Sequence, residues 1–253
     1  MKNSKILVTG MSGLIGGIAG RKFAVNHDVS ALGRSNVEGF PTSIVDIGDG
    51  IDGILPALEG VKTVIHMAGS RGNVPAETHI KANVTGVYNL FEACRIAGVK
   101  RIVAASTGAV IAGYEKDEPY KSLVHDPDLE MPAQHPNITV ETPVRPRNMY
   151  AVSKMFTENL GRMYSEQHGM SIICIRIGKV EIDDVPLNAR NASVWCSHRD
   201  ILQVIDKAVH APDDLKYADV FACSDNPTRY RDIEQTNNVL GFVPQDSAAE
   251  HGF

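Results

Sequence analysis

The chain alternates between short runs of apolar residues and longer segments in which apolar residues recur every three or four positions. The short runs predict buried strands, and the periodic segments predict helices that pack on them. The expected strands cover residues 5–8, 29–32, 43–45, 63–66, 101–106 and 171–176, and the expected helices lie at about 14–25, 51–58, 78–97 and 150–166. This alternation predicts an α/β fold with a doubly wound parallel sheet, whose ligands bind at the carboxyl ends of the strands.

Residues 114–149 interrupt the alternation with six prolines and many charges. An irregular segment of this length in a compact domain is commonly functional or mobile. Its position directly before Tyr150 favours a lid or a wall of the substrate site, and a surface insertion without a role is the alternative. We therefore expect a nucleotide-binding domain at 1–177, which includes this insertion, and a small C-terminal substrate-binding portion at 178–253.

Composition narrows the class of protein. With 253 residues, 43% of them hydrophobic, the chain can form one large α/β domain with a sizeable core. A formal net charge of −5 with scattered basic residues argues against nucleic acid as a partner. The apolar start at residues 6–8 is too short for a signal peptide or a membrane span. The four cysteines form no Cys-x-x-Cys pair and lie in apolar stretches, which favours a reduced, cytoplasmic protein.

Three glycines, Gly10, Gly13 and Gly16, lie between the first predicted strand and the first predicted helix. Glycine there permits a tight turn and a close approach of the backbone to phosphate, and the N-terminus of the helix offers free N–H groups. We therefore expect this turn to hold the pyrophosphate of a dinucleotide, and a flexible turn without a ligand is the alternative. The other residues of the turn expected to contact the cofactor are Ser12, Leu14 and Ile15.

The end of the second predicted strand indicates which dinucleotide binds, because an acidic residue there would bind the ribose hydroxyls of NAD. The chain instead has Gly33, Arg34 and Ser35, and a guanidinium beside a hydroxyl suits the 2′-phosphate of NADP. We therefore expect NADP, and a solvated loop arginine is the alternative interpretation of Arg34. Asp46, after the third predicted strand, is placed either to meet the adenine or to form a turn before Gly48.

Tyr150 and Lys154 lie one helical turn apart, on the same face of a predicted helix. A free tyrosine titrates near pH 10, so action as a base near pH 7 needs a pKa shift of roughly three units, about 4 kcal/mol. The ammonium of Lys154 and an oxidised nicotinamide would both favour the phenolate. Thr107 offers a hydroxyl to orient the substrate oxygen, and Asn83 is placed to hold a backbone–water relay to Lys154. Tyr-x-x-x-Lys alone is commonly structural, but together with the glycine turn it indicates an oxidoreductase.

Several motifs, in their order along the chain, resemble the extended short-chain dehydrogenase/reductases of the NAD-dependent epimerase/dehydratase family. They are the glycine turn at 9–16, His-Met-Ala-Gly at 66–69, Asn-Val-Thr-Gly at 83–86, Ser-Thr at 106–107 and Tyr-x-x-x-Lys at 150–154. Stretches at 176–178, 194–200, 224–226 and 240–246 narrow the match, because they are similar to uronate dehydrogenases and archaeal-type glucose-6-phosphate dehydrogenases.

The resemblance implies a Rossmann fold and an enzyme that oxidises the anomeric carbon of a sugar to a lactone, passing hydride to the nicotinamide. It implies that Tyr150 is the base, that Lys154 is its partner and that Thr107 binds the reacting oxygen. Asn83 completes this tetrad. The expected cofactor contacts are completed by Ile47, Met67, Ala68, Gly69 and Ile177.

The chain departs from the uronate dehydrogenases at positions that bear on the substrate. Gly108 and Ala109 replace an asparagine and a histidine that contact the sugar, and Gly33 replaces the acidic residue that selects NAD. Arg190 corresponds by its spacing before Trp195 to a carboxylate-binding arginine of that family. Together with Gly108, the substrate contacts expected are Arg71, Thr107, Lys179 and Arg190. Three cations around one pocket suit a carboxylate or a phosphate, although each alone is commonly a solvated surface charge.

The main hypothesis is an NAD(P)-dependent sugar dehydrogenase with a small-molecule substrate. An epimerase uses the same tetrad, but only about 75 residues follow Gly178, which leaves little room for a nucleotide sugar. A cofactor-binding regulator without turnover would be expected to lack the tyrosine or the lysine. The helices at 78–97 and 150–166 commonly pair across a two-fold axis in this superfamily, which predicts a homodimer. Met155, Leu160 and Met163 would then serve either the interface or the core. No ligand-spaced histidine or cysteine cluster predicts a metal site.

Overall fold

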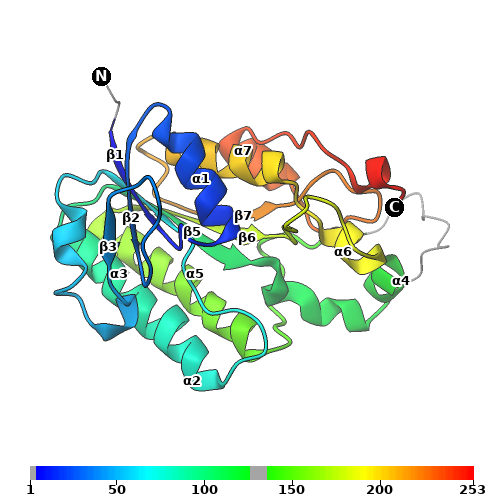
Figure 1. Ribbon diagram of the computed structural model, residues 1–253. Coiled ribbons are helices and arrows are strands. Elements are labelled where there is room, and N and C mark those ends of the chain that lie inside the picture. Colours follow the sequence, from blue (N-terminus) through cyan, green and yellow to red (C-terminus); the bar gives the residue numbers. More distant parts are fainter. Residues whose placement is uncertain (1–3, 126–135) are drawn as a thin grey trace.

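The computed structural model describes residues 4–125 and 136–253, which form one seven-stranded parallel sheet with helices on both faces (Figure 1). The strand order is β3-β2-β1-β4-β5-β6-β7, so the order reverses between β1 and β4 and a crevice forms at the carboxyl ends of the strands. The strands are β1 (Lys5–Thr9), β2 (Asp28–Gly33), β3 (Thr42–Ile44), β4 (Thr63–His66), β5 (Arg101–Thr107), β6 (Ser171–Ile177) and β7 (Tyr217–Ala222). The predicted doubly wound sheet is confirmed.

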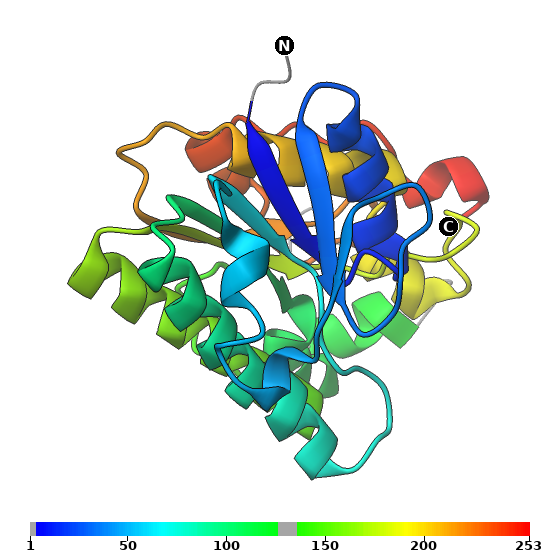
Figure 2. The same ribbon diagram turned by 60° about the vertical axis from the view of Figure 1, so that its left-hand side comes forward.

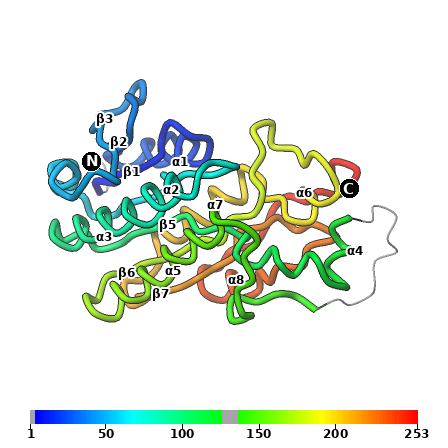
Figure 3. The backbone as a smooth tube through the Cα atoms, turned by 90° about the horizontal axis from the view of Figure 1, so that it is seen from below, coloured from blue at the N-terminus to red at the C-terminus, as the bar shows by residue number. Residues whose placement is uncertain are grey.

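Helices cover the sheet from two sides (Figure 2). On one side, α1 (Leu14–Ala24), α7 (His198–Val209) and α8 (Glu234–Leu240) pack against the strands. On the other side lie α3 (Gly86–Ile96) and α5 (Met149–His168), which run next to each other (Figure 3). Every residue of β4, β5 and β6 is buried between these layers, which explains why the central residues of these strands are apolar.

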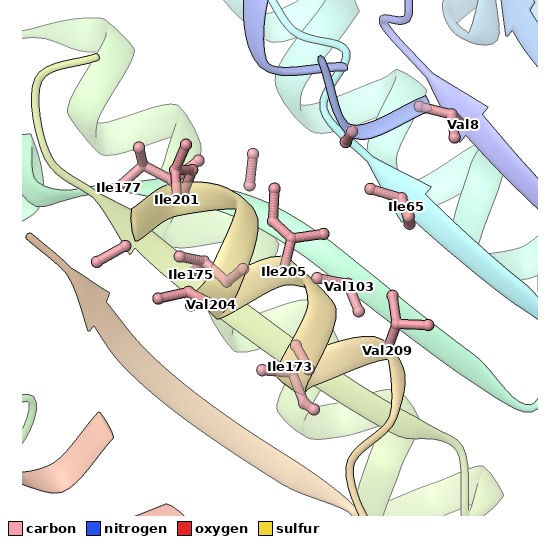
Figure 4. Packing of buried hydrophobic residues seen from close by; sticks show 14 of the residues in the cluster. Val8, Ile65, Val103, Ile173, Ile175, Ile177, Ile201, Val204, Ile205 and Val209 are labelled. Carbon is pink, nitrogen blue, oxygen red and sulfur yellow. The ribbon is translucent and has the colours of Figure 1, made fainter. Parts of the chain in front are cut away.

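The core beneath α7 joins one stripe of a helix to the branched residues of the strands (Figure 4). Ile201, Val204 and Ile205 recur at three- and four-residue steps and pack in one cluster with Ile173 and Ile175 of β6. The helix begins after Ser197, whose hydroxyl accepts a hydrogen bond from the backbone N–H of Asp200. Both α7 and β7 were missing from the predicted elements, although α7 has this helical spacing in its sequence.

Two predicted helices differ from the observed ones. Residues 51–58 form only a 3₁₀ turn, η2 (Leu55–Leu58), because Pro56 has no N–H to continue a helical ladder. The helix predicted at 78–97 consists of α2 (Ala76–His79), a π-helical segment, η3 (Ile80–Thr85), and α3. The six predicted strands agree with the bounds of β1 to β6 to within two residues.

A group of short helices lies beyond the carboxyl ends of β5, β6 and β7 (Figure 1). They are η4 (Gly108–Lys116), α4 (Tyr120–His125), α6 (Ala189–Val194) and η5 (Ala248–His251). The segment expected to be irregular at 114–149 therefore includes the end of η4 and all of α4, and its residues 126–135 lie outside the described ranges. The expected boundary at 177 leaves β7 on its C-terminal side, although β7 pairs with β6 in the same sheet. No helix within the described ranges is long and apolar enough to cross a membrane.

Candidate active site

The glycine turn between β1 and α1 brings the backbone close to neighbouring segments. A Cβ added to Gly10, whose φ is +70°, would lie 2.6 Å from the backbone N of Ala68, and one added to Gly16 would lie 2.3 Å from the carbonyl oxygen of Gly10. Gly13 caps α1 without a side-chain hydrogen bond, and the first turn of α1 carries no acidic residue. The open N–H groups and the positive end of the helix dipole therefore suit a pyrophosphate.

A cavity of about 1260 Å³ runs from this turn along the carboxyl ends of the strands. The volume exceeds that of typical small-ligand pockets and suits a dinucleotide together with a substrate. The predicted site residues that line it are Gly10, Ser12, Gly13, Leu14, Ile15, Gly16, Arg34, Ser35, Asp46, Ile47, Met67, Ala68, Gly69, Arg71, Thr107, Tyr150, Lys154, Ile177 and Lys179. The structure thus brings together nearly all of the predicted residues, and only Asn83, Gly108 and Arg190 are not part of the lining.

At the end of the cavity near β2, Arg34 and Ser35 lie with Asp46 and Lys81. The carboxylate of Asp46 accepts a 2.9 Å hydrogen bond from the N–H of Gly48 and pairs with Lys81 at 3.2 Å. The Gly48 N–H and then Lys81 hold the pKa of Asp46 below its ordinary value. Asp46 therefore forms the turn before Gly48 and also lines the cavity, and its contact with the adenine stays a prediction. Lys81 was missed in the sequence, where it is an ordinary charged residue two positions before Asn83.

Tyr150 lies in the first turn of α5, which begins after Asn148; the side chain of Asn148 accepts a hydrogen bond from the N–H of Ala151. Burial raises the pKa of Tyr150, whereas a hydrogen bond from the Thr107 hydroxyl and the positive charge of Arg71 lower it, and the net direction is upward. The phenol is therefore protonated at neutral pH in the cofactor-free protein. The largest favourable charge effect on it comes from Arg71, while the sequence had suggested Lys154.

Lys154 is 3% exposed, and its Nζ donates a 2.8 Å hydrogen bond to the carbonyl oxygen of Ala105 in β5. Burial lowers the pKa of this ammonium to about 8, so most of it is still charged at pH 7. Thr107, at the end of β5, is 8% exposed and its Oγ1 accepts a 3.2 Å hydrogen bond from the N–H of Ala109. The single O–H of Thr107 is therefore directed to the phenol oxygen of Tyr150 in this structure.

Asn83 lies behind the cavity wall, in the π-helical segment η3. Its side chain accepts a hydrogen bond from the N–H of Ser70 at 2.8 Å and donates to the Ser70 carbonyl and to the Ser153 hydroxyl, both at 2.9 Å. Asn83 thus fixes the loop after β4 against α5, and Ser153 was missed as its partner. The expected relay from Asn83 to Lys154 stays a prediction.

The structure places Arg190 outside the cavity lining, contrary to its predicted substrate contact. Its Nε and Nη2 donate to the carboxylate of Glu115 at 2.7 and 2.9 Å, because α4 packs against both α6 and η4 and brings the two charges together. Lys179 does line the cavity, where it also pairs with Glu181 at 3.3 Å. Of the three predicted cations, Arg71 and Lys179 therefore face the same space as Thr107.

Comparisons with known proteins identify the family of this chain. The NAD dependent epimerase/dehydratase family matches residues 6–182. The chain is 30% identical over 258 residues to the NAD-dependent glucose-6-phosphate dehydrogenase of Haloferax volcanii, covering 98% of this chain and 95% of the relative. It is 30% identical to the L-arabinose 1-dehydrogenase (NAD(P)(+)) of the same organism, covering 97% of this chain and 98% of the relative.

A solved structure and a further relative show the same similarity to sugar dehydrogenases. A mutant uronate dehydrogenase from Agrobacterium tumefaciens complexed with NAD has a TM-score of 0.84 to this chain at 27% identity, covering 98% of this chain and 87% of that one. The uronate dehydrogenase of Pseudomonas syringae is 27% identical over 251 residues, covering 97% of this chain and 83% of the relative. The similarity to uronate and glucose-6-phosphate dehydrogenases expected from the sequence is confirmed.

Proposed function

We propose that this protein, which belongs to the NAD dependent epimerase/dehydratase family, oxidises the anomeric carbon of a sugar that carries a carboxylate or a phosphate. It is an NAD(P)-dependent oxidoreductase, as are the relatives that it matches along nearly its whole length. One observation carries the proposal: Thr107, Tyr150 and Lys154 line the same cavity as the glycine turn. A hydroxyl, a phenol and an ammonium thus face one space that also suits a dinucleotide.

The residues of this chain would manage the proton of the reaction, while a bound nicotinamide supplies the hydride acceptor. The C1–H electron pair leaves the sugar as hydride, and the proton of the C1 hydroxyl passes to the ionised Tyr150, so that C1–OH becomes the C=O of a lactone. Thr107 donates to the reacting oxygen and orients it. Arg71 provides positive charge that favours ionised Tyr150, and the ammonium of Lys154 and a bound oxidised nicotinamide would add to it against the effect of burial.

The charge of the cavity supports an anionic substrate. Arg71 and Lys179 line it on the side of Thr107, and a guanidinium and an ammonium bind carboxylate or phosphate through charge-assisted hydrogen bonds. The relatives described above include a uronate dehydrogenase and a glucose-6-phosphate dehydrogenase, so both substrate classes occur among them.

NADP is the proposed cofactor. Arg34 is exposed at the end of β2 and lines the cavity next to Ser35, in the position that meets the adenosine ribose in doubly wound sheets. Its guanidinium is suited to a 2′-phosphate. The four cysteines are free thiols and buried, which supports a place in the reducing cytoplasm.

A homodimer is proposed on the side of α3 and α5. Tyr88 and Ile96 on α3 are 45% and 53% exposed, and Val152 and Met163 on α5 are 45% and 43% exposed. Two adjacent helices with apolar residues in solvent suit pairing with a second copy. Of the α5 residues considered for this interface, Leu160 packs in the protein's own core, and Met155 also packs internally.

The first test is cofactor reduction with glucuronate, galacturonate, glucose 6-phosphate, glucose and arabinose, each with NADP⁺ and with NAD⁺. We expect reduction with at least one anionic sugar, and a loss of roughly 100- to 10,000-fold in kcat for Tyr150→Phe, because the base is removed. Arg34→Ala should lower kcat/KM for NADP⁺ roughly 10- to 100-fold and spare NAD⁺, because only the 2′-phosphate contact is lost.

Binding of the cofactor without reduction by any sugar would contradict the dehydrogenase proposal. Inversion of a sugar centre without net reduction would instead identify an epimerase. An exposed arginine of α1 outside the cavity lining, Arg21, offers the matched control, and Arg21→Ala should leave the preference between NADP⁺ and NAD⁺ unchanged.

A further inference from the structure

Arg231 places its guanidinium directly against Gly108, the residue that follows Thr107. A Cβ added to Gly108 would lie 2.3 Å from both Cζ and Nη1 of Arg231 and 2.6 Å from Nη2. The guanidinium therefore fills the space that any side chain at position 108 would need. An arginine more than 120 residues away in the chain supplies the polar group that Gly108 lacks, next to the proposed catalytic hydroxyl.

The guanidinium of Arg231 is buried, and the carboxylate near it, Glu115, is shared with two other arginines. Arg231 is 3% exposed, and its Nε and Nη1 have no hydrogen-bond partner within the described ranges. The ring of Tyr230 lies 5.7 Å from its Cζ, which compensates only weakly for lost hydration. A buried guanidinium that keeps unpaired donors is costly, so its retention next to Gly108, the neighbour of the lining residue Thr107, points to a ligand that carries further negative charge.

The neighbouring carboxylate is already occupied. Glu115 has a fully enclosed side chain, which receives two hydrogen bonds from Arg190, one from Arg147 at 3.2 Å and one from the Tyr230 hydroxyl at 2.7 Å. Burial alone would raise the pKa of Glu115, but the bonds from Arg190 and Tyr230 outweigh burial and hold it below its ordinary value. Three arginines thus surround one carboxylate, and Arg231 is the one left without a hydrogen bond to it.

The backbone holds Arg231 firmly in this place. Arg231 and Ile138 form an isolated parallel β-bridge. The N–H of Ile138 donates to the carbonyl of Tyr230 at 2.7 Å, and its carbonyl accepts from the N–H of Asp232 at 2.9 Å. The Arg231 carbonyl accepts from Arg229 at 2.7 Å. A guanidinium fixed in advance loses little entropy when it binds an oxyanion, which is what a specificity-determining residue requires.

We propose that Arg231, which lies with Gly108 directly behind the lining residue Thr107, recognises the anionic group of the sugar, a carboxylate or a phosphate. This inference rests on the proposed sugar dehydrogenase function and assigns to Arg231 the role that the sequence had assigned to Arg190. Position 108 must then be glycine, because a side chain there would occupy the space that the guanidinium of Arg231 fills next to Thr107.

The experiment compares Arg231→Gln and Arg231→Lys with wild type, using glucuronate, glucose 6-phosphate and glucose as substrates. We expect Arg231→Gln to lower kcat/KM for the anionic sugar roughly 10- to 100-fold, mainly through KM, and to leave glucose nearly unchanged. Arg231→Lys should recover part of the loss because it keeps the charge. Whichever of the two anions suffers the selective loss identifies the source of the oxyanion. Arg147→Gln is the matched control, since it removes a guanidinium that is bonded to Glu115.

A second variant keeps Arg231 in the chain. Gly108→Ser displaces the guanidinium by its new side chain, and it should lower selectivity for the anionic sugar in the same direction. Calorimetry with glucuronate and glucose 6-phosphate, on protein saturated with NADPH, measures recognition without turnover. Weaker anion binding in Arg231→Gln supports the inference even if no sugar is oxidised, which would by itself contradict only the proposed function. Equal anion affinity in both proteins, or an equal loss for glucose and the anions, overturns the inference.

Discussion

At the scale of single residues, the site depends on a missing methyl group at Gly69. A Cβ there would lie 2.8 Å from Oδ1 of Asn83 and 3.2 Å from Nζ of Lys154. The glycine therefore allows the loop after β4 to pass between the amide that anchors it and the proposed catalytic ammonium. Glycine is required at the end of the His-Met-Ala-Gly stretch because of this packing and not because of turn geometry.

We expect Gly69→Ala to lower kcat roughly 10- to 100-fold, because displacing Asn83 or Lys154 by a fraction of an ångström disturbs the alignment of Tyr150. Overpacking should also lower the free energy of unfolding by about 1–3 kcal/mol. Steady-state kinetics and thermal unfolding measure the two effects. Gly53→Ala is the matched control, since its new methyl group would meet only Val45, at 3.3 Å. Full activity in Gly69→Ala would contradict the assigned role.

Sequence patterns identified the residues that act through local spacing. Tyr150 and Lys154 are one helical turn apart, so α5 alone places them together, and Thr107 follows from the end of a strongly apolar strand. The contact of Arg231 with Gly108 and the pairing of Arg190 with Glu115 join positions 75 or more residues apart. Such contacts depend on how α6 and the segment after β7 pack beyond the sheet. This packing cannot be predicted from the local spacing of residues.

At the scale of elements, apolar period alone could not distinguish a helix that serves the core from one that also faces solvent. Leu160 and Met163 lie three residues apart on α5, yet the first is 9% exposed and the second 43%. Strands β4, β5 and β6 could be predicted because they are buried on both faces, whereas β7 was missed. Residues 51–58 had helical spacing, but a proline and short length reduced them to a 3₁₀ turn.

The apolar surface of α3 and α5 leads to a prediction about assembly. In light scattering, wild type should have a mass roughly twice the 27.4 kDa of one chain. Met163→Glu should shift it to the monomer mass, because a charge would be buried between the two copies. Val25→Glu, at a site that is 76% exposed after α1, should keep the dimer. A monomeric wild type, or a dimer unaffected by Met163→Glu, would exclude this face as the interface.

At the scale of the whole molecule, the stability should depend on pH through a histidine at the centre of the sheet. His66 is fully buried at the end of β4, and its Nδ1 lies 2.7 Å from the hydroxyl of Thr9 in β1. Burial lowers the pKa of His66 to about 3, and the charge of Lys154 acts in the same direction. The unfolded chain therefore binds this proton more readily than the folded one.

The pKa of His66 is lower in the folded protein than in the unfolded chain. The contribution of neutral His66 to the free energy of unfolding is therefore complete above about pH 6.5 and is lost as the pH falls towards 3. At pH 5 the loss should reach about 2 kcal/mol. We expect His66→Asn to become more stable relative to wild type by this amount between pH 7.5 and pH 5, measured by urea unfolding. His125→Gln, at an exposed position, should show no such change. A difference between His66→Asn and wild type that is constant with pH would refute this assignment.

The π-helical segment between α2 and α3 sets a requirement on chain length as well as on residue type. A π turn accommodates one extra residue, which changes the phase of the helix by about 100°. Lys81, near the start of this segment, faces the cavity, while Val87 and Leu90, which follow the segment, face the core. Deleting one residue here would leave the core face intact and rotate Asn83 away from Ser70 and Ser153. Among related chains, a single-residue gap at this turn would therefore mark the loss of the anchor more clearly than any substitution.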